Sequence, residues 1–192
     1  MKVRILAFAG SARRDSFNKK VLAVAADGAR DAGAEVTVVD LRDFPMPLYD
    51  GDLEAESGPP EHATRLKELM KSHHGFLLAC PEYNSGITPL LKNAIDWCSR
   101  PSEGEPMLAA YQGKTAALVA ASPGALGGLR GLVGVRSILG NIGVVVIPDQ
   151  IAVPKVHEAF DAAGSMTDEK TADRVQAVGR RLTEVTAALH PS

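Results

Sequence analysis

The sequence has few of the residues that build metal centres or disulfide frameworks. Its 192 residues include two cysteines, Cys80 and Cys98, and each stands in an apolar segment without another cysteine or a histidine at metal-ligand spacing. We interpret both as small buried hydrophobic side chains. The sequence therefore predicts no disulfide and no metal site.

The chain also has almost no net charge. Its 21 basic and 23 acidic residues give a formal charge of −2, which provides no broad electrostatic attraction to nucleic acid or to an anionic membrane surface. We expect neither as a partner, and any anion must be bound by a local group of residues.

Long hydrophobic runs are missing as well. No segment approaches the ~20 apolar residues of a membrane span, and the apolar stretch at the start is too short and interrupted for a signal peptide. We therefore expect a cytoplasmic protein. With 45% hydrophobic and 23% charged residues, the composition is that of a folded globular protein, and the length favours one domain over residues 1–192.

Apolar runs alternate with helical patterns along the chain. The runs cover residues 3–9, 35–40, 76–80, 115–121 and 144–147. Helical periodicity covers a segment that ends near residue 31, and then residues 61–72, 90–98, 130–139 and 168–189. This alternation predicts right-handed βαβ units and an α/β fold whose parallel sheet has helices on both faces. Residues 43–60 are rich in Pro, Gly and acidic residues, which indicates an irregular surface loop.

Ligands of open α/β sheets bind beyond the carboxyl ends of the strands, so the loop after the first run is a candidate site. Gly10 permits a tight turn there, Ser11, Ser16 and Asn18 supply donors at a helix N-terminus, and Arg13 or Arg14 adds a charge. The loop lacks the patterns of a Walker loop and of a Rossmann dinucleotide site, which favours a phosphate monoester. Alternatively, Ser16 and Asn18 cap the helix and the arginines are solvated.

The loops after the third and fourth runs carry further candidates. Tyr83 could form a flat wall for a planar heterocycle and Gly86 would permit close backbone approach, although a simple turn in which Tyr83 packs over the helix is the alternative. The glycine-rich loop at residues 122–128 could present N–H groups to ring carbonyls, or it could be a flexible connector.

Three motifs resemble the NADPH-dependent FMN reductase family, which includes quinone and chromate reductases. They are Gly-Ser-Ala-Arg-Arg-Asp-Ser-Phe-Asn at residues 10–18, Pro-Glu-Tyr-Asn at residues 81–84, and Leu-Lys-Asn-Ala-Ile-Asp-Trp at residues 91–97. The resemblance implies a flavodoxin-like three-layer fold with a five-stranded parallel sheet in the order 2-1-3-4-5. It also implies FMN as cofactor, NADPH or NADH as electron donor, and a small-molecule electron acceptor such as a quinone, a flavin, chromate or an azo compound.

The resemblance assigns the binding residues loop by loop. It implies that the FMN phosphate is held by Ser11, Arg13, Ser16, Phe17 and Asn18. The ring would lie against Pro81, Glu82, Tyr83, Asn84 and Gly86, and its far edge would meet Ser122, Gly124 and Gly127. Family members form dimers or tetramers, so a homodimer or homotetramer is expected, with Trp97 and its helix as the candidate interface or, alternatively, as core.

Two features depart from the family pattern. Thr88-Pro89-Leu90 stands where many members have a Pro-Gly pair, which leaves the access of the acceptor open, and the chain beyond Gly143 matches loosely.

Hydride transfer is the cofactor's own chemistry, so we assign no catalytic acid or base. We predict that the histidines, which lie outside the three loops, are surface residues; they are His62, His73, His74, His157 and His190. The competing hypotheses are a non-enzymatic electron carrier like the flavodoxins, which are usually more acidic than this chain, and a module that keeps the fold without flavin.

Overall fold

The computed structural model describes residues 2–191. Its main sheet has five parallel strands in the order β2-β1-β3-β6-β7, and a two-stranded antiparallel hairpin, β4-β5, stands apart from it. The strands are β1 (Arg4–Ala9), β2 (Glu35–Val39), β3 (Gly75–Ala79), β4 (Glu82–Tyr83), β5 (Gly86–Ile87), β6 (Thr115–Ala121) and β7 (Val145–Val153). The sheet confirms the predicted α/β class and, with the hairpin set aside, the predicted strand order.

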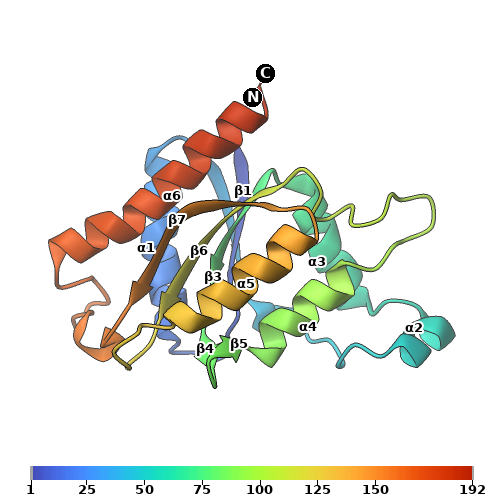
Figure 1. Cartoon of the computed structure of the whole chain (residues 1–192), viewed down its shortest axis with the longest axis horizontal. Coiled ribbons are helices and arrows are strands. Elements are labelled where there is room, and N and C mark those ends of the chain that lie inside the picture. Colours follow the sequence, from blue (N-terminus) through green and yellow to red (C-terminus); the bar gives the residue numbers. More distant parts are fainter. Residues whose placement is uncertain (1, 192) are drawn as a thin grey trace.

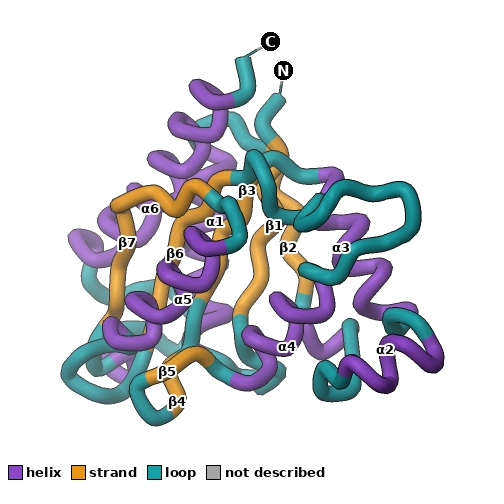
Figure 2. Tube along the Cα trace, turned by 45° about the vertical axis from the view of Figure 1, so that its right-hand side comes forward, coloured by secondary structure: helices purple, strands orange, loops and turns teal. Residues whose placement is uncertain are grey.

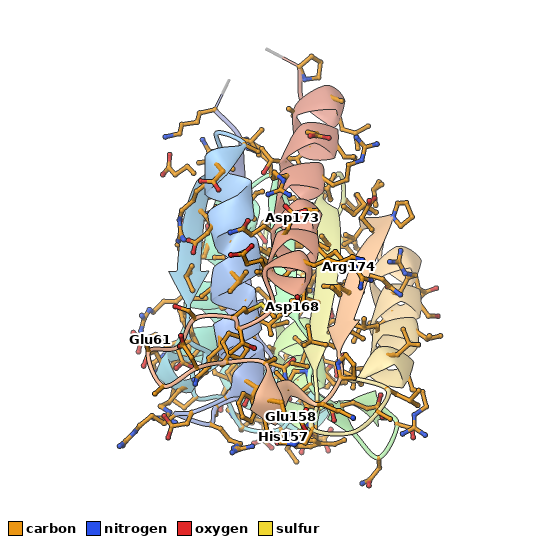
Figure 3. All side chains as sticks on the ribbon, turned by 90° about the vertical axis from the view of Figure 1, so that its left-hand side faces the viewer. Glu61, His157, Glu158, Asp168, Asp173 and Arg174 are labelled. Carbon is orange, nitrogen blue, oxygen red and sulfur yellow. The ribbon has the colours of Figure 1, made fainter. Side chains whose placement is uncertain are left out.

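Helices cover both faces of this sheet (Figure 1). The helices are α1 (Phe17–Asp31), α2 (Gly51–Ser57), α3 (Glu61–Ser72), α4 (Pro89–Cys98), α5 (Leu129–Asn141) and α6 (Glu169–Leu189), with 3-10 turns η1 (Leu41–Asp43) and η2 (Val156–Glu158), and α2 alone has no buried residue. Helices α1 and α6 pack side by side on one face, as Figure 3 shows, and α3, α4 and α5 lie on the other.

The central strands are apolar because both of their sides are covered. Strands β3 and β6 are buried at every position, and Leu6 of β1 pairs with Phe76 while Phe8 pairs with Leu78. Alternate residues of these strands enter two hydrophobic clusters, one beneath α1 and α6 and one beneath α3, α4 and α5. Because they are buried on both sides, these strands are continuous apolar runs in the sequence, and for this reason they could be predicted.

Two predicted boundaries were wrong. The segment 43–60 is not wholly irregular, since Asp50 caps the short helix α2 by accepting from the N–H of Asp52 at 2.9 Å. The last strand does not end at Ile147 but continues to Val153, with a register irregularity in its pairing to β6. Pro148 lies within it, and an edge strand can hold a proline because one side of its backbone has no partner strand.

The loops that follow β1, β3 and β6 gather at one end of the sheet, together with the hairpin β4-β5 (Figures 1 and 2). His157 and Glu158, in the turn after β7, lie at the same end (Figure 3). No helix within residues 2–191 has the length and apolar character needed to cross a membrane.

Candidate functional site

Two adjoining cavities open among the loops at the carboxyl ends of β1, β3 and β6. The smaller, of about 240 Å³, is lined by Ser11, Arg13, Ser16, Phe17, Asn18, Pro81, Glu82, Tyr83, Ala121, Ser122 and Pro123. The larger, of about 500 Å³, is lined by Gly10, Ser11, Ala12, Arg13, Tyr83, Thr88, Pro89 and Leu90. Because Ser11, Arg13 and Tyr83 line both, the two cavities lie next to each other, and together they have the size of cofactor sites.

The first turn of α1 leaves donors exposed to the smaller cavity. Ser16 is the N-cap residue, but its side chain makes no capping hydrogen bond. Among residues 2–191, neither the N–H of Phe17 nor that of Asn18 has an acceptor, and the Arg13 guanidinium makes no ion pair. A helix N-terminus with free N–H groups and a nearby arginine can bind an anion. The simple capping alternative for Ser16 does not apply in this structure.

The Asn18 side chain has a different partner from the predicted phosphate. Its Nδ2 donates to the carbonyl of Ala121 at 2.9 Å, and its Oδ1 accepts from the N–H of Ala121 at 3.0 Å. This amide therefore ties the start of α1 to the end of β6. What Asn18 can offer to an anion is its main-chain N–H.

Tyr83 stands on a tight hairpin. Asn84 and Ser85 have φ of 50° and 66°, so the β4-β5 connection is a two-residue turn of the type I′ class, whose twist suits paired strands. Tyr83 is 53% exposed and lines both cavities, which makes its ring an open wall between them. Asn84 and Gly86 line neither cavity, and their role as binding residues stays a prediction.

The loop after β6 is held by hydrogen bonds of its main chain and of the Ser122 side chain. The hydroxyl of Ser122 accepts from the N–H of Gly124 at 3.1 Å, while Ser122 and Pro123 border the smaller cavity. Gly127 is buried with φ of 62°, and a Cβ there would lie 2.6 Å from the carbonyl carbon of Val153. Gly127 therefore serves the close packing of the loop on β7, and neither it nor Gly124 lines a cavity.

The Thr88-Pro89-Leu90 segment begins α4 and walls the larger cavity. The Thr88 hydroxyl donates to the carbonyl of Gly10 at 2.8 Å and accepts from the N–H of Leu91 at 3.3 Å. It thus caps α4 and fixes the first loop at once. This segment departs from the family pattern, but the link that Thr88 makes between the two loops was not predicted. A threonine at the N-cap, directly before Pro89, was the signal that the sequence offered for it.

Cys80 and Cys98 are buried and free, as predicted. Burial raises the pKa of the Cys98 thiol to about 12 and that of Cys80 well above its usual value, so both stay protonated near neutral pH. Among residues 2–191 no three His, Cys, Asp or Glu side chains lie together as a metal-binding group.

The surface prediction for His73 was wrong. His73 is buried, with Nε2 2.8 Å from the hydroxyl of Thr37 and Nδ1 2.6 Å from the carbonyl of Leu69. Its position at the end of a helix predicted exposure to solvent. In the structure, however, its ring lies against β2, where it contacts Thr37. Trp97 is likewise buried, and its Nε1 donates to the carbonyl of Pro47 at 2.8 Å, which supports its interpretation as core.

Comparisons with known proteins identify the family of the chain. The model of the family described as NADPH-dependent FMN reductase matches residues 3–158. The chain belongs to this family. An NAD(P)H-dependent FMN reductase of Pseudomonas aeruginosa is 33% identical over 175 residues, which is 91% of this chain and 90% of that protein. An NAD(P)H:quinone oxidoreductase of Solanum tuberosum is 34% identical and covers 92% of this chain and 89% of its own.

A solved structure extends the likeness to three dimensions. The flavoenzyme FerB, an NAD(P)H:(acceptor) oxidoreductase from Paracoccus denitrificans, superposes with a TM-score of 0.79 at 30% identity, covering 97% of this chain and 98% of that one. This FMN reductase family member is therefore an oxidoreductase that works with FMN and a nicotinamide donor, as the sequence motifs predicted. The non-enzymatic carrier is not favoured.

Proposed function

We propose that the chain is one FMN-binding domain that passes electrons from NADPH or NADH to a small acceptor of the quinone class. The free donors at the start of α1 carry this proposal, because they form an anion site at the edge of a cavity bounded by Tyr83. A quinone acceptor is supported by relatives named quinone reductases.

In this proposal the smaller cavity takes the cofactor. Ser11, Arg13, Ser16, Phe17 and the main chain of Asn18 bind the phosphate, and the ring lies against Pro81, Glu82 and Tyr83 with Ser122 at its far edge. Bound FMN supplies the hydride-accepting and electron-donating chemistry. The chain binds and orients the reactants and excludes water from the contact between their rings.

The larger cavity adjoins the ring position across Tyr83, and we propose that it receives the nicotinamide and then the acceptor. A quinone would take up a hydride from the reduced cofactor and a proton from solvent there, and it would leave as the hydroquinone. Since both substrates would use the same space in turn, steady-state measurements should give parallel double-reciprocal lines; intersecting lines would show that both bind together.

Homo-oligomerisation and a cytoplasmic location are also part of the proposal. Leu126, Leu129 and Val133 on and beside α5 are exposed apolar side chains, and α5 packs against the β4-β5 hairpin that carries the exposed Tyr83. A homodimer or homotetramer would cover such side chains. Light scattering of the purified chain measures the state directly, and a monomer at micromolar concentration would contradict this part.

A single spectroscopic experiment tests the function. The purified chain, loaded with FMN, is mixed anaerobically with NADPH or NADH and then with a benzoquinone. We expect the flavin absorbance to bleach without any partner protein and to return on addition of the quinone. A chain that takes up no FMN, or one that bleaches solely with a partner protein, would overturn the proposal in favour of a flavin-free module or a carrier.

A further inference from the structure

Glu82 holds the β4-β5 hairpin against the first turn of α5. Its Oε1 accepts from Nε and Nη2 of Arg130 at 3.2 and 2.9 Å, and its Oε2 accepts from the N–H of Gly131 at 3.0 Å. The Glu82 side chain is 9% exposed, whereas that of Arg130 is 58% exposed. The carboxylate is thus covered, while its partner's cation extends toward solvent.

The first turn of α5 has no cap of its own. The N-cap residue is Gly128, which has no side chain, and the N–H of Gly131 in the first turn cannot bond within the helix. Glu82 supplies the missing acceptor from a different loop. A Cβ at Gly131 would lie 3.3 Å from the Cβ of Glu82, so the glycine lets the hairpin lie close to the helix.

These bonds join two of the three loops that border the smaller cavity. Glu82 and Tyr83 come from the hairpin after β3, while Ser122 and Pro123 come from the loop that leads into α5. Figure 2 shows the hairpin beneath the start of α5. A displacement of Glu82 would therefore change the distance between the Tyr83 wall and the opposite edge of the cavity.

We propose that Glu82 is a positioning residue that acts through Arg130 and Gly131. It fixes the Tyr83 hairpin beside the flavin ring, and it forms with Arg130 a pair of charges that cancel next to that ring. The inference rests on the proposed function, since it requires FMN in this cavity.

The ionisation of Glu82 agrees with this role. Burial alone would raise its pKa, but the N–H of Gly131 and the Arg130 guanidinium outweigh burial and hold the pKa below its usual value. The carboxylate is therefore charged at neutral pH.

Removing either charge should affect the cofactor in opposite directions. Reduction makes the flavin ring more negative, so Glu82→Gln, which leaves Arg130 unbalanced, should favour the reduced form and raise the midpoint potential. Arg130→Gln leaves the Glu82 carboxylate without its counter-charge and should lower the midpoint potential. A residue with a merely structural role would move the potential in the same direction in both variants, because both would loosen the same hairpin.

The test measures the midpoint potential and the dissociation constants of oxidised and reduced FMN for the full-length wild type and the two variants. We expect the ratio of the two dissociation constants to change about three- to tenfold, in one direction for Glu82→Gln and in the other for Arg130→Gln. In the double variant Glu82→Gln/Arg130→Gln this ratio should return close to the wild-type value. Glu82→Ala, which also removes the bond to Gly131, should weaken binding of oxidised FMN about tenfold.

Glu184→Gln is the matched control. It makes the same change in another ion pair with an arginine, Arg181, on α6, and should leave the potential unchanged. Shifts of the same sign, or no shift in either variant, would overturn the positioning role while wild-type FMN binding stands. Failure of the wild type itself to bind FMN would instead overturn the proposed function.

Discussion

At the amino end of the sheet, buried polar side chains are hydrogen-bonded to other groups of the chain, whereas at the carboxyl end the first N–H groups of α1 border a cavity without an acceptor among residues 2–191. Thr115 and Thr186, both fully buried, lie 2.6 Å apart between their hydroxyl oxygens, and His73 is bonded through both ring nitrogens. At the other end, the N–H groups that begin α1 have no acceptor among residues 2–191.

This contrast separates polar residues that stabilise the fold from those that are available to a ligand. A buried polar group without a partner costs free energy, so natural proteins bond such groups internally or leave them where water or a ligand can reach them. The polar groups at the amino end are bonded internally, whereas the N–H groups at the start of α1 are left where a ligand can reach them. Substitutions at the start of α1 should therefore weaken FMN binding with little change in stability, and substitutions at the amino end should lower stability without changing FMN binding.

The largest effect is expected at the start of α1. Arg13→Ala combined with Ser16→Ala removes a charge and a hydroxyl from the proposed phosphate site, and hydrogen bonds to charged groups contribute about 1.5–3 kcal/mol each. FMN affinity should fall about 100-fold or more, while the free energy of unfolding of the FMN-free protein should change by less than about 1 kcal/mol. Titration of FMN fluorescence and urea unfolding measure the two quantities.

Arg14→Ala is the matched control for this variant. Arg14 is the exposed neighbour of Arg13 and lines neither cavity, so its removal should change FMN affinity little. Unchanged affinity in the Arg13 and Ser16 variant would mean that the phosphate is bound elsewhere.

Most of the fold could be predicted from the sequence, because central strands covered on both faces are continuous apolar runs such as residues 115–121. The edge strand β7 was cut short at Pro148, since local reasoning treats proline as a break whereas the sheet edge accommodates it. Helix α2 was missed because it contributes no buried residue and so has no apolar face to detect.

The sequence predicted which loops form the candidate site, but it did not predict what individual side chains in those loops bond to. The sequence placed Asn18 and Glu82 near a ligand, and both line the smaller cavity. Their side chains nevertheless bond to Ala121 and to Arg130 and Gly131, residues that are 103, 48 and 49 positions away. Such contacts depend on how the strands are ordered, and no local pattern reports them.

An intermediate effect is expected from the threonine pair at the amino end. Thr186→Val leaves the fully buried Thr115 hydroxyl without its partner and should lower the free energy of unfolding by about 1–3 kcal/mol. FMN affinity should not change, because the pair lies at the end of the sheet opposite the cavities.

Thr115→Val with Thr186→Val sharpens this test. Removing both hydroxyls leaves no unpaired buried group at this contact, so the double variant should be less destabilised than the sum of the two single variants. Additive losses in urea unfolding would mean that the hydroxyl contact contributes nothing of its own.

The smallest effect is expected from His74, also at the amino end, where its Nδ1 accepts from the N–H of Arg4 at 3.0 Å. Burial lowers the pKa of His74, and the charges of Arg4, His190, Lys114 and His73 lower it further. The unfolded chain therefore takes up this proton at a higher pH than the folded one. The free energy of unfolding should fall as pH decreases below about 6.5, the usual histidine value, through the lower folded value.

His74→Asn isolates this contribution, since an amide oxygen can still accept from Arg4 but does not titrate. Urea unfolding of the FMN-free protein between pH 7.5 and 5.5 should give a shallower loss of stability for the variant than for the wild type. His157→Asn removes an exposed histidine from the carboxyl end and serves as the control. If wild type and His74→Asn lose stability equally, the proton uptake that weakens the fold belongs to another group, and the amino end is less sensitive to charge than its burial indicates.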